Sequence, residues 1–251
     1  MNLELEGKSV LVTGGSKGIG QAIAYAFLEE GAKVGIVGRT LSDLESAQKE
    51  GIEIFQGDVT NEKDRERVMK DFLEKFGTIN VLVNNAGGSN GSTVMETSME
   101  QFEEAMHLNF LSAVDLSKKA AEVMSGNADG GAIINISSIF GRESGGKPTY
   151  NASKAAMISF TKSFGDEMIS KGVRVNGVAP GSILHETGNW KKRLEHDPEK
   201  INAFVEEHIA AGRFGTVEEV ANVAVFLASK KASWVVGSTL NVDGGQSYSN
   251  F

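Results

Sequence analysis

Tyr150 and Lys154 stand four positions apart in a stretch that reads as a helix. Side chains at that separation project from one face of a helix, one turn apart. A lysine ammonium beside a phenol favours the phenolate, which lowers the tyrosine pKa from its usual value of about 10 towards the neutral range. The pair is therefore suited to a tyrosine that gives a proton to a carbonyl oxygen or takes one from an alcohol. An isolated pair at this spacing is more often a partly buried ring beside a solvated amine.

Three further polar side chains occur where apolar segments end or are interrupted. Ser137 and Ser138 follow the apolar run Ala132–Ile136, and either hydroxyl is suited to polarise a substrate oxygen by hydrogen bonding. The other serine is expected to satisfy local backbone groups. Asn109 lies in an apolar helical stretch, where a buried amide requires hydrogen-bond partners.

A glycine-rich turn, Thr13–Gly20, joins the first apolar run to a helical pattern. Glycine allows the backbone to turn tightly and to approach a diphosphate, and the following helix N-terminus offers free N–H groups and a partial positive charge. Such a string alone is also compatible with a plain strand-to-helix turn, but the flanking strand and helix favour a dinucleotide site. The residues expected to contact the cofactor here are Gly14, Ser16, Lys17, Gly18, Ile19 and Gly20.

The elements that must position these residues follow from the apolar pattern. Short runs rich in valine and isoleucine alternate with longer amphipathic stretches, which predicts a β-α-β order. This order is typical of a Rossmann-type doubly wound α/β fold, here one domain over 1–251 with a parallel sheet of about seven strands and helices on both faces. Ligands bind such sheets at the carboxyl ends of the strands. The strands are expected at Ser9–Val12, Lys33–Val37, Ile52–Phe55, Val81–Val83, Ala132–Ile136, Val173–Val178 and Thr239–Val242.

The segment at about 182–212 has no clear strand, which predicts a lid over the substrate. Trp190, Leu184 and Phe204 within it are suited to form an apolar wall, and Trp190 is equally suited to anchor the lid by packing. The helices elsewhere are expected at Ile19–Glu30, Glu62–Phe76, Met99–Met124, Thr149–Ser170 and Val217–Ala228.

The composition restricts the partners. Lys and Arg number 25 against 33 Asp and Glu, and the net charge of −8 repels nucleic acid and anionic membrane surfaces, so neither is expected as a partner. There is no cysteine, and the four histidines lack metal-ligand spacing, so no catalytic metal is expected. His185, near the lid, is expected to be a surface residue. Because no apolar leader or membrane span is present, a cytoplasmic location is expected.

Taken together, the motifs resemble those of the short-chain dehydrogenase/reductase family over nearly the whole chain. The glycine turn is similar to the family's TGxxxGIG sequence. The other motifs follow in family order and are Asp58-Val59, Asn84-Asn85-Ala86-Gly87, Tyr150-Asn151-Ala152-Ser153-Lys154, Pro180-Gly181 and Val242-Asp243-Gly244-Gly245.

The resemblance implies roles for the catalytic residues. Tyr150 would be the acid or base, Lys154 would also hold the nicotinamide ribose, and Asn109 would hold a water that links the lysine to solvent. Of the two serines we choose Ser138, because the family serine is followed, after two intervening residues, by a glycine, here Gly141.

Ser137 instead matches the more common family separation between the serine and the tyrosine. Ser138 lies 12 positions before Tyr150, one fewer than in many members. A deletion of one residue in the loop Arg142–Pro148 would explain the difference.

The resemblance also implies the cofactor. Members that use NAD carry an acidic residue at the end of the second strand, where this chain has Gly38 followed by Arg39. Lys17 and Arg39 are therefore expected to bind a ribose 2′-phosphate, which predicts NADP(H). As isolated residues, both cations would be solvated at the surface. The other residues implied to contact the cofactor are Thr40, Asp58, Val59, Asn85, Ala86, Gly87, Tyr150, Lys154, Pro180, Gly181 and Ile183.

The expected activity is hydride transfer between NADP(H) and the carbonyl or alcohol carbon of a free small molecule. The nearest alternative is a 3-oxoacyl-[acyl-carrier-protein] reductase, but the stretch 125–131 lacks the basic residues that would dock an acidic carrier, and only Lys171 remains nearby. A second alternative is a protein that binds NADP(H) without catalysis. Such a protein has no need of Tyr150 and Lys154, which are present here. The family is usually tetrameric, so a homotetramer is expected.

Overall fold

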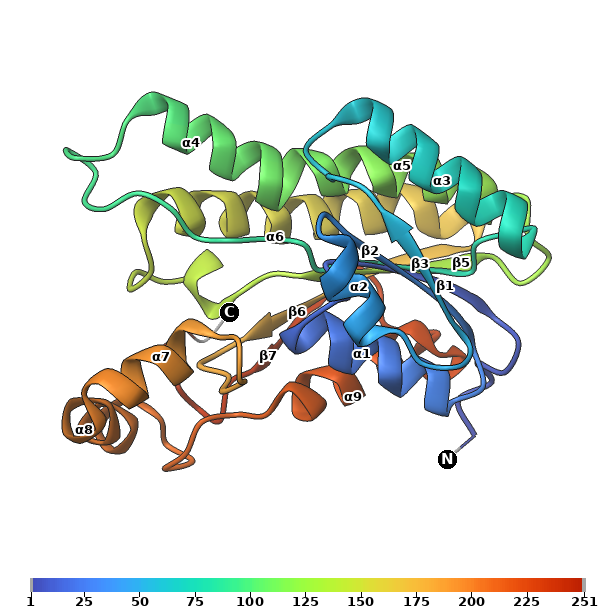
Figure 1. Cartoon of the computed structure of the whole chain (residues 1–251). Helices are drawn as coiled ribbons and strands as arrows, with labels where there is room; N and C mark the ends of the chain where they lie inside the picture. The colour runs from blue at the N-terminus through green and yellow to red at the C-terminus, as the bar shows by residue number, and fades with distance from the viewer. Residues whose placement is uncertain (1, 250–251) are drawn as a thin grey trace.

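The computed structural model describes residues 2–249 and contains a single sheet of seven strands enclosed by helices (Figure 1). Neighbouring strands all run parallel, so the predicted doubly wound α/β fold is confirmed. Each predicted strand is present to within two residues. The strands are β1 (Ser9–Thr13), β2 (Lys33–Gly38), β3 (Ile52–Gln56), β4 (Val81–Asn84), β5 (Gly131–Ile136), β6 (Val173–Pro180) and β7 (Thr239–Val242).

The strand order is β3-β2-β1-β4-β5-β6-β7, so the chain changes direction across the sheet between β1 and β4. Val10 of β1 pairs with Val34 on one side and with Val81 on the other. At such a switch point the loops after the two strands diverge and leave a crevice at their carboxyl ends. The glycine turn follows β1 and residues 85–87 follow β4, so both motifs lie at this crevice.

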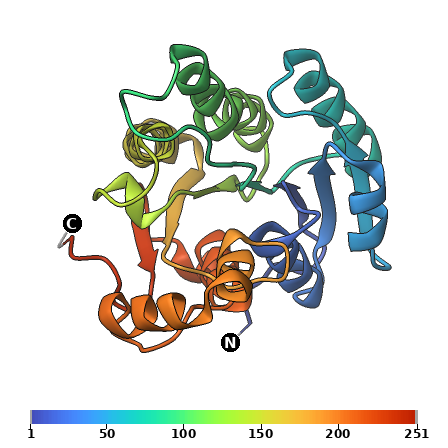
Figure 2. The ribbon, with the colours of Figure 1, turned by 60° about the vertical axis from the view of Figure 1, so that its left-hand side comes forward.

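Helices cover both faces of the sheet (Figure 2). One layer contains α1, α2 and α9, and the other contains α3, α5 and α6. The helices are α1 (Gly18–Glu29), α2 (Leu41–Ala47), α3 (Glu62–Phe76), α4 (Met99–Met106), α5 (Ser112–Met124), α6 (Pro148–Met168), α7 (Asn189–His196), α8 (Pro198–His208) and α9 (Val217–Ala228).

The core consists of two apolar clusters, one on each face of the sheet. Successive side chains of a strand point to opposite faces. Val10 and Val12 accordingly pack in the cluster with α1 and α9, whereas Leu11 packs in the cluster with α3 and α5. In β5, Ile134 packs in the cluster with α1 and α9, and Ile133 packs in the cluster with α3 and α5. Strands with two buried faces explain why the strand segments are continuous apolar runs.

The predicted helix Met99–Met124 is interrupted. A π-helical turn, His107–Leu111, separates α4 from α5 and contains the buried Asn109. The Asn109 Nδ2 donates to the Ala105 carbonyl oxygen at 2.9 Å, one turn earlier. A side chain that bonds this carbonyl competes with the regular backbone ladder, and such wide turns occur frequently at functional sites.

The segment predicted as a lid contains two helices that the apolar pattern did not reveal. No residue of α7 is buried, so α7 lacks the apolar stripe that predicts a helix. At α8, Pro198 occupies the first turn and the Asp197 side chain accepts from the Lys200 N–H at 3.2 Å. Helix α2 also went unpredicted because it is short. Within residues 2–249, no helix is long and apolar enough to cross a membrane.

Candidate active site

A cleft of about 1360 Å³ opens at the carboxyl ends of β1, β4, β5 and β6, with α7 and α8 along one side. The predicted site residues that line this cleft are Gly14, Lys17, Gly18, Ile19, Gly20, Asn85, Ala86, Gly87, Ser138, Tyr150, Lys154, Pro180, Gly181 and Ile183. Predicted residues outside its lining are Ser16, Arg39, Thr40, Asp58, Val59 and Asn109.

Hydrogen bonds tie the glycine turn to the loop after β4. The Thr13 Oγ1 accepts from the Asn85 backbone N–H at 3.0 Å, and the Asn85 Nδ2 donates to the carbonyl oxygens of Thr13 and Gly14 at 3.0 and 3.1 Å. A Cβ at Gly20 would lie 2.3 Å from the Gly14 oxygen, and Gly18 has a left-handed φ of +54°. Glycine is therefore required at both positions, which leaves the start of α1 open to a diphosphate.

Tyr150, Lys154 and Ser138 converge on the cleft from two elements. Tyr150 and Lys154 lie one turn apart on α6, with the Lys154 Nζ 5.5 Å from the centre of the Tyr150 ring. Ser138 lies just beyond β5 and lines the same cleft as Tyr150. The serine Oγ also accepts from the Phe140 N–H at 3.2 Å. Ser138 and Tyr150 are thus placed to hold the same substrate oxygen.

Burial sets the protonation of this group. Lys154 is 3% exposed, and the loss of solvent lowers its pKa from 10.5 to about 8. Burial raises the pKa of Tyr150 above its usual value, and the Ser138 side chain only partly opposes that shift. The prediction that the neighbouring lysine lowers the tyrosine pKa is therefore wrong for the chain by itself. The Lys154 Nζ instead donates to the Ile136 carbonyl oxygen at 2.8 Å.

Ser137 has a structural environment. Its Oγ donates to the Lys154 carbonyl oxygen at 3.1 Å, and its backbone N–H donates to the Val178 oxygen at 2.7 Å. The side chain is 3% exposed. These contacts match the role expected of the serine that does not serve the substrate, and they support the choice of Ser138.

Asn109 holds the loop after β4 against the lysine. Its Nδ2 donates to the Gly88 oxygen at 3.0 Å, and its Oδ1 accepts from the Gly88 N–H at 2.8 Å. A Cβ at Gly87 would lie 2.7 Å from that Oδ1 and 3.4 Å from the Lys154 Nζ. Both amide hydrogens of Asn109 are used within the protein, so its side chain positions Gly87 and Gly88 beside Lys154.

The two predicted phosphate-binding cations lie in different places. Lys17 lines the main cleft, where its Nζ forms an ion pair of 2.8 Å with Asp43 of α2. Arg39 lines an adjoining hollow of about 550 Å³ that shares Gly88 and Ser89 with the cleft. Most of the hollow's lining comes from α4 and the residues beside it, and it includes Glu100, Glu103 and Glu104. Asp58 lies nearby, and its Oδ1 accepts from the Thr60 N–H at 2.9 Å and hydroxyl at 2.7 Å.

The lid side of the cleft is aromatic. Trp190 stacks on Phe204 with ring centres 4.9 Å apart and lies 5.3 Å from Phe214. Trp190 and Phe204 also line the cleft, so Trp190 serves both alternatives, packing anchor and apolar wall. Leu184 does not line the cleft, so its predicted place in the apolar wall is wrong. Its backbone N–H donates to the Gly215 carbonyl oxygen at 2.9 Å, next to the β-bridge between Ile183 and Gly215.

His185 is a cleft residue that the sequence did not reveal. It lines the cleft, and its ring lies so close to the glycine turn that a Cβ at Gly18 would be 2.8 Å from its Cε1. Its Nδ1 is 3.2 Å from the Thr187 hydroxyl, and burial lowers its pKa. The expectation of a surface residue is therefore wrong. The signal was its position four residues after Gly181 of the Pro180-Gly181 motif.

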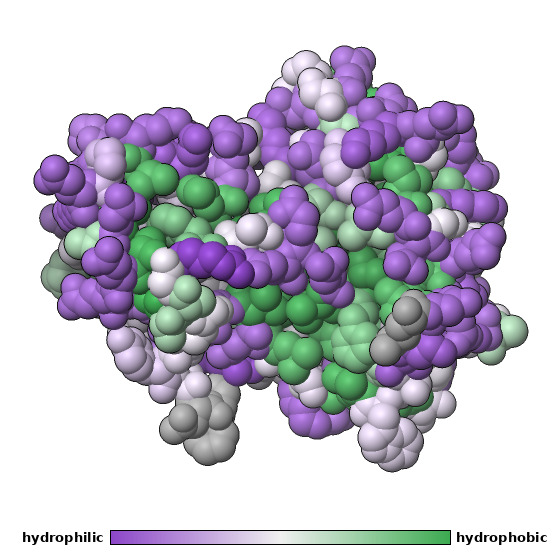
Figure 3. All heavy atoms as spheres, turned by 90° about the horizontal axis from the view of Figure 1, so that it is seen from below, coloured by the Kyte–Doolittle hydropathy of each residue, from purple (hydrophilic) through white to green (hydrophobic). Residues whose placement is uncertain are grey.

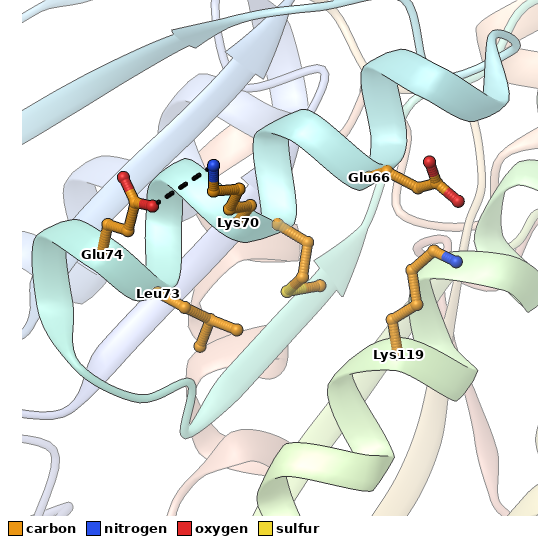
Figure 4. A pocket seen from close by; sticks show the side chains of 6 residues that line it. Glu66, Lys70, Leu73, Glu74 and Lys119 are labelled. Atoms are coloured by element: carbon orange, nitrogen blue, oxygen red, sulfur yellow. Dashed lines mark ion pairs between the residues drawn. The ribbon is translucent and has the colours of Figure 1, made fainter.

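A further hollow of about 570 Å³ lies between α3 and α5 (Figure 4). Its walls combine aliphatic side chains with lysines and glutamates, and Lys70 pairs with Glu74 across one helical turn at 3.6 Å. None of the predicted site residues lines it. Within the described part of the chain, no group of three His, Cys, Asp or Glu side chains could hold a metal ion.

Comparison with known proteins adds to this geometry. The family model described as Enoyl-(Acyl carrier protein) reductase matches residues 14–247. The 3-oxoacyl-[acyl-carrier-protein] reductase FabG of Vibrio cholerae is 39% identical, over 97% of this chain and 98% of that protein. A sorbitol dehydrogenase of Cereibacter sphaeroides is 33% identical, over 97% of this chain and 98% of its own.

Solved structures agree. The L-sorbose reductase of Gluconobacter frateurii, crystallised with NADPH and L-sorbose, superposes with a TM-score of 0.93 and 33% identity. The match covers 99% of this chain and 100% of that one. Likeness over this much of the sequence and the fold means that the chain belongs to the short-chain dehydrogenase/reductase family of oxidoreductases.

Proposed function

We propose that the protein is an NADP(H)-dependent oxidoreductase that transfers a hydride between nicotinamide and the carbonyl or alcohol carbon of a small molecule. One observation carries the proposal: Tyr150, Ser138 and Lys154 line the same cleft as the glycine turn. A dinucleotide bound at Gly14–Gly20 and a substrate oxygen bound at Tyr150 would therefore share one chamber.

The residues present fit the cofactor. Gly20 packs so tightly against the Gly14 carbonyl oxygen that no side chain fits there, and the N-terminus of α1 that follows the turn suits a diphosphate. Lys17 and Arg39 are the cations available for a 2′-phosphate, and no acid occupies the end of β2, where Gly38 stands. The complex of L-sorbose reductase with NADPH supports the same choice. We assign Thr40, Asp58 and Val59 to the adenosine end, and Pro180, Gly181 and Ile183 to the nicotinamide end.

The chain's own side chains then have distinct tasks. NADP(H), when bound, supplies or accepts the hydride. Ser138 donates a hydrogen bond to the substrate oxygen, and Tyr150 gives that oxygen its proton in reduction or takes it in oxidation. Lys154 would hold the nicotinamide ribose, and its Nζ lies 5.5 Å from the centre of the Tyr150 ring. Asn109 positions Gly87 and Gly88 next to the lysine.

Residues 182–212 act in this proposal as the lid, with α7 and α8 closing over the substrate and excluding water. We also propose a homotetramer, in line with the family. Sedimentation of the purified protein tests the assembly: a species of four chains is expected, and a species of 26.7 kDa alone contradicts it.

A 3-oxoacyl-[acyl-carrier-protein] reductase is the second candidate, favoured by the 39% identity to FabG of Vibrio cholerae. Charge at the expected docking stretch argues against it. Asp129 in the stretch 125–131 pairs with Lys8 at 2.8 Å and Lys230 at 3.2 Å, so the cations nearby are already neutralised. An acidic carrier docks on basic surface.

Cofactor titration followed by a substrate screen tests the proposal. The dissociation constants of NADPH and NADH are measured by fluorescence, and NADPH is expected to bind at least tenfold more tightly, about 1.4 kcal/mol. Carbonyl compounds, free and carrier-linked, are then screened for NADPH oxidation. Tighter binding of NADH would refute the cofactor assignment, and efficient turnover of the carrier-linked compound alone would establish the second candidate.

A further inference from the structure

The charged side chains that line the large cleft are all cationic, although the chain carries 33 acidic residues against 25 basic ones. Among the described residues 2–249, no Asp or Glu lines this cleft. The lysines and arginines that do so are Lys17, Lys147, Lys154, Lys192, Arg193 and Lys200.

Two of these cations already have tasks. Lys17 lies at the glycine turn and pairs with Asp43, and Lys154 is buried beside Tyr150. The other four, Lys147, Lys192, Arg193 and Lys200, form what we call the lid cations. Lys147 directly precedes α6, Lys192 and Arg193 lie on α7, and Lys200 lies on α8.

The lid cations have no counterions. Within the described part of the chain, no carboxylate lies within 4.0 Å of any of their charged atoms. Lys191, their neighbour on α7, differs: it lies outside the cleft lining and pairs with Glu186 at 3.5 Å and Glu195 at 3.8 Å. Glu186 and Glu195 are thus engaged by Lys191, whereas the lid cations line the cleft without such a partner among the described residues.

The lid cations adjoin the aromatic wall. The Arg193 guanidinium lies 5.0 Å from the centre of the Trp190 ring, which stacks on Phe204. Figure 3 shows the face that carries α7, α8, α9 and α1, where hydrophilic side chains crowd over the α7–α8 end. Lys147 comes from a different element, the start of α6, and lines the same cleft.

Charges of one sign along a cleft with apolar walls concentrate ligands of the opposite sign. A single lysine at a surface is ordinarily solvated and carries no such meaning. A cleft lined by six cations and by no Asp or Glu of residues 2–249, in a chain of net charge −8, does carry such a meaning. Lys192, Arg193 and Lys200 lie on the two lid helices, α7 and α8, whereas the cofactor diphosphate belongs at the glycine turn.

We propose that the natural substrate carries an anionic group, a carboxylate or a phosphate ester, which the lid cations bind while Ser138 and Tyr150 hold its carbonyl or alcohol oxygen. This inference rests on the proposed function, whose substrate class it names. Sorbitol and L-sorbose, which appear in the names of two similar proteins, lack such a group. A small anion is favoured over an acidic carrier protein, because the lid cations line the cleft itself.

Three ketoses that differ at one carbon provide the test. L-Sorbose is neutral, L-sorbose 6-phosphate carries a phosphate, and 5-keto-D-gluconate is the same chain with a carboxylate at the terminal carbon. Binding of each to the full protein saturated with NADP⁺ is measured by calorimetry. At least one anion is expected to bind tenfold or more tightly than L-sorbose, and the better of the two distinguishes carboxylate from phosphate. Binding of that anion is expected to weaken as the salt concentration rises.

The double variant Lys192→Gln/Lys200→Gln keeps Arg193, whose guanidinium packs on Trp190. It is expected to lose the preference for the anion by about tenfold, with the dissociation constant of NADPH unchanged. The variant Lys63→Gln/Lys70→Gln on α3 removes the same charge far from the cleft and is the matched control. An equal loss in this control would reduce the effect to net charge and overturn the inference.

Other outcomes separate the inference from the proposed function. The anion site is refuted if neither anion binds more tightly than L-sorbose, or if the Lys192/Lys200 variant weakens NADPH to the same extent. It is also refuted if only a carrier-linked oxoacyl substrate depends on the lid cations. If the anion binds through these cations but no carbonyl compound is reduced, the anion site is supported and the proposed reaction is refuted.

Discussion

The ammonium of Lys154 donates a hydrogen bond of 2.8 Å to the carbonyl oxygen of Ile136, the last residue of β5. A second bond crosses the same gap in the other direction, because the Ser137 hydroxyl donates to the Lys154 carbonyl at 3.1 Å. Helix α6, which carries Tyr150, is therefore fastened to the strand that leads to Ser138. The two groups expected to hold the substrate oxygen are positioned by the core rather than by loops.

Burial of Lys154 gives a pH dependence of stability. Its pKa is about 8 in the folded chain against 10.5 for an ordinary lysine, so the folded state releases this proton first. Below pH 8 both states are protonated and the buried ammonium costs stability; between about pH 8 and 10.5 this cost disappears. Relative to Lys154→Met, the wild type should gain about 3 kcal/mol of unfolding free energy across that window.

Urea unfolding of both proteins from pH 7 to pH 11, without cofactor, provides the measurement. Titration of the other groups is common to both and cancels in the difference. Two stability profiles that run parallel through this range would show that Lys154 is not desolvated.

The two adjacent serines should separate function from stability. Ser138→Ala removes the donor to the substrate oxygen and should lower kcat by roughly 10²- to 10³-fold. Ser137→Ala removes a buried bond to α6 and should cost about 1 kcal/mol of stability with turnover within a few fold of wild type. Steady-state kinetics and thermal unfolding on both variants check this. The reverse pattern would move the catalytic role to Ser137.

The ion pair between Lys17 and Asp43 should influence cofactor choice. Lys17→Met is expected to weaken NADPH binding about tenfold and NADH binding little, because only NADPH offers a 2′-phosphate. Asp43→Asn frees the ammonium from its 2.8 Å partner and should tighten NADPH binding severalfold. The dissociation constants of NADPH and NADH for each variant, measured by fluorescence titration, test both expectations. Equal changes for NADPH and NADH would mean that Lys17 does not reach the phosphate.

The sequence predicted the sheet well because its central strands are buried on both faces and therefore appear as nearly continuous apolar runs. It could not predict α7, whose residues are all at least partly exposed, or the π-helical turn, which depends on a bond from Asn109 to a carbonyl one turn away. The raised pKa of Tyr150 was missed for a similar reason. Proximity to Lys154 was visible in the spacing, whereas the desolvation of both groups arises only when β5 and α6 pack together.

Charge in the cleft is also a property of the fold. Lys147, Lys192 and Lys200 are ordinary surface lysines in the sequence, scattered among glutamates. Folding pairs Glu186 and Glu195 with Lys191 and leaves the lid cations along the cleft. The glycine turn was predictable because its conformation requires glycine itself. The position of His185 against Gly18 was not, since the two are far apart in the sequence.

The most direct test of the central claim is the variant Tyr150→Phe, assayed by NADPH oxidation with whichever carbonyl compound the wild type reduces best. The variant keeps the ring and loses only the hydroxyl, so it should fold and bind NADPH as the wild type does. Turnover should fall by at least about 10²-fold, because the proton donor is gone. Unchanged turnover would contradict the account and remove Tyr150 from the reaction.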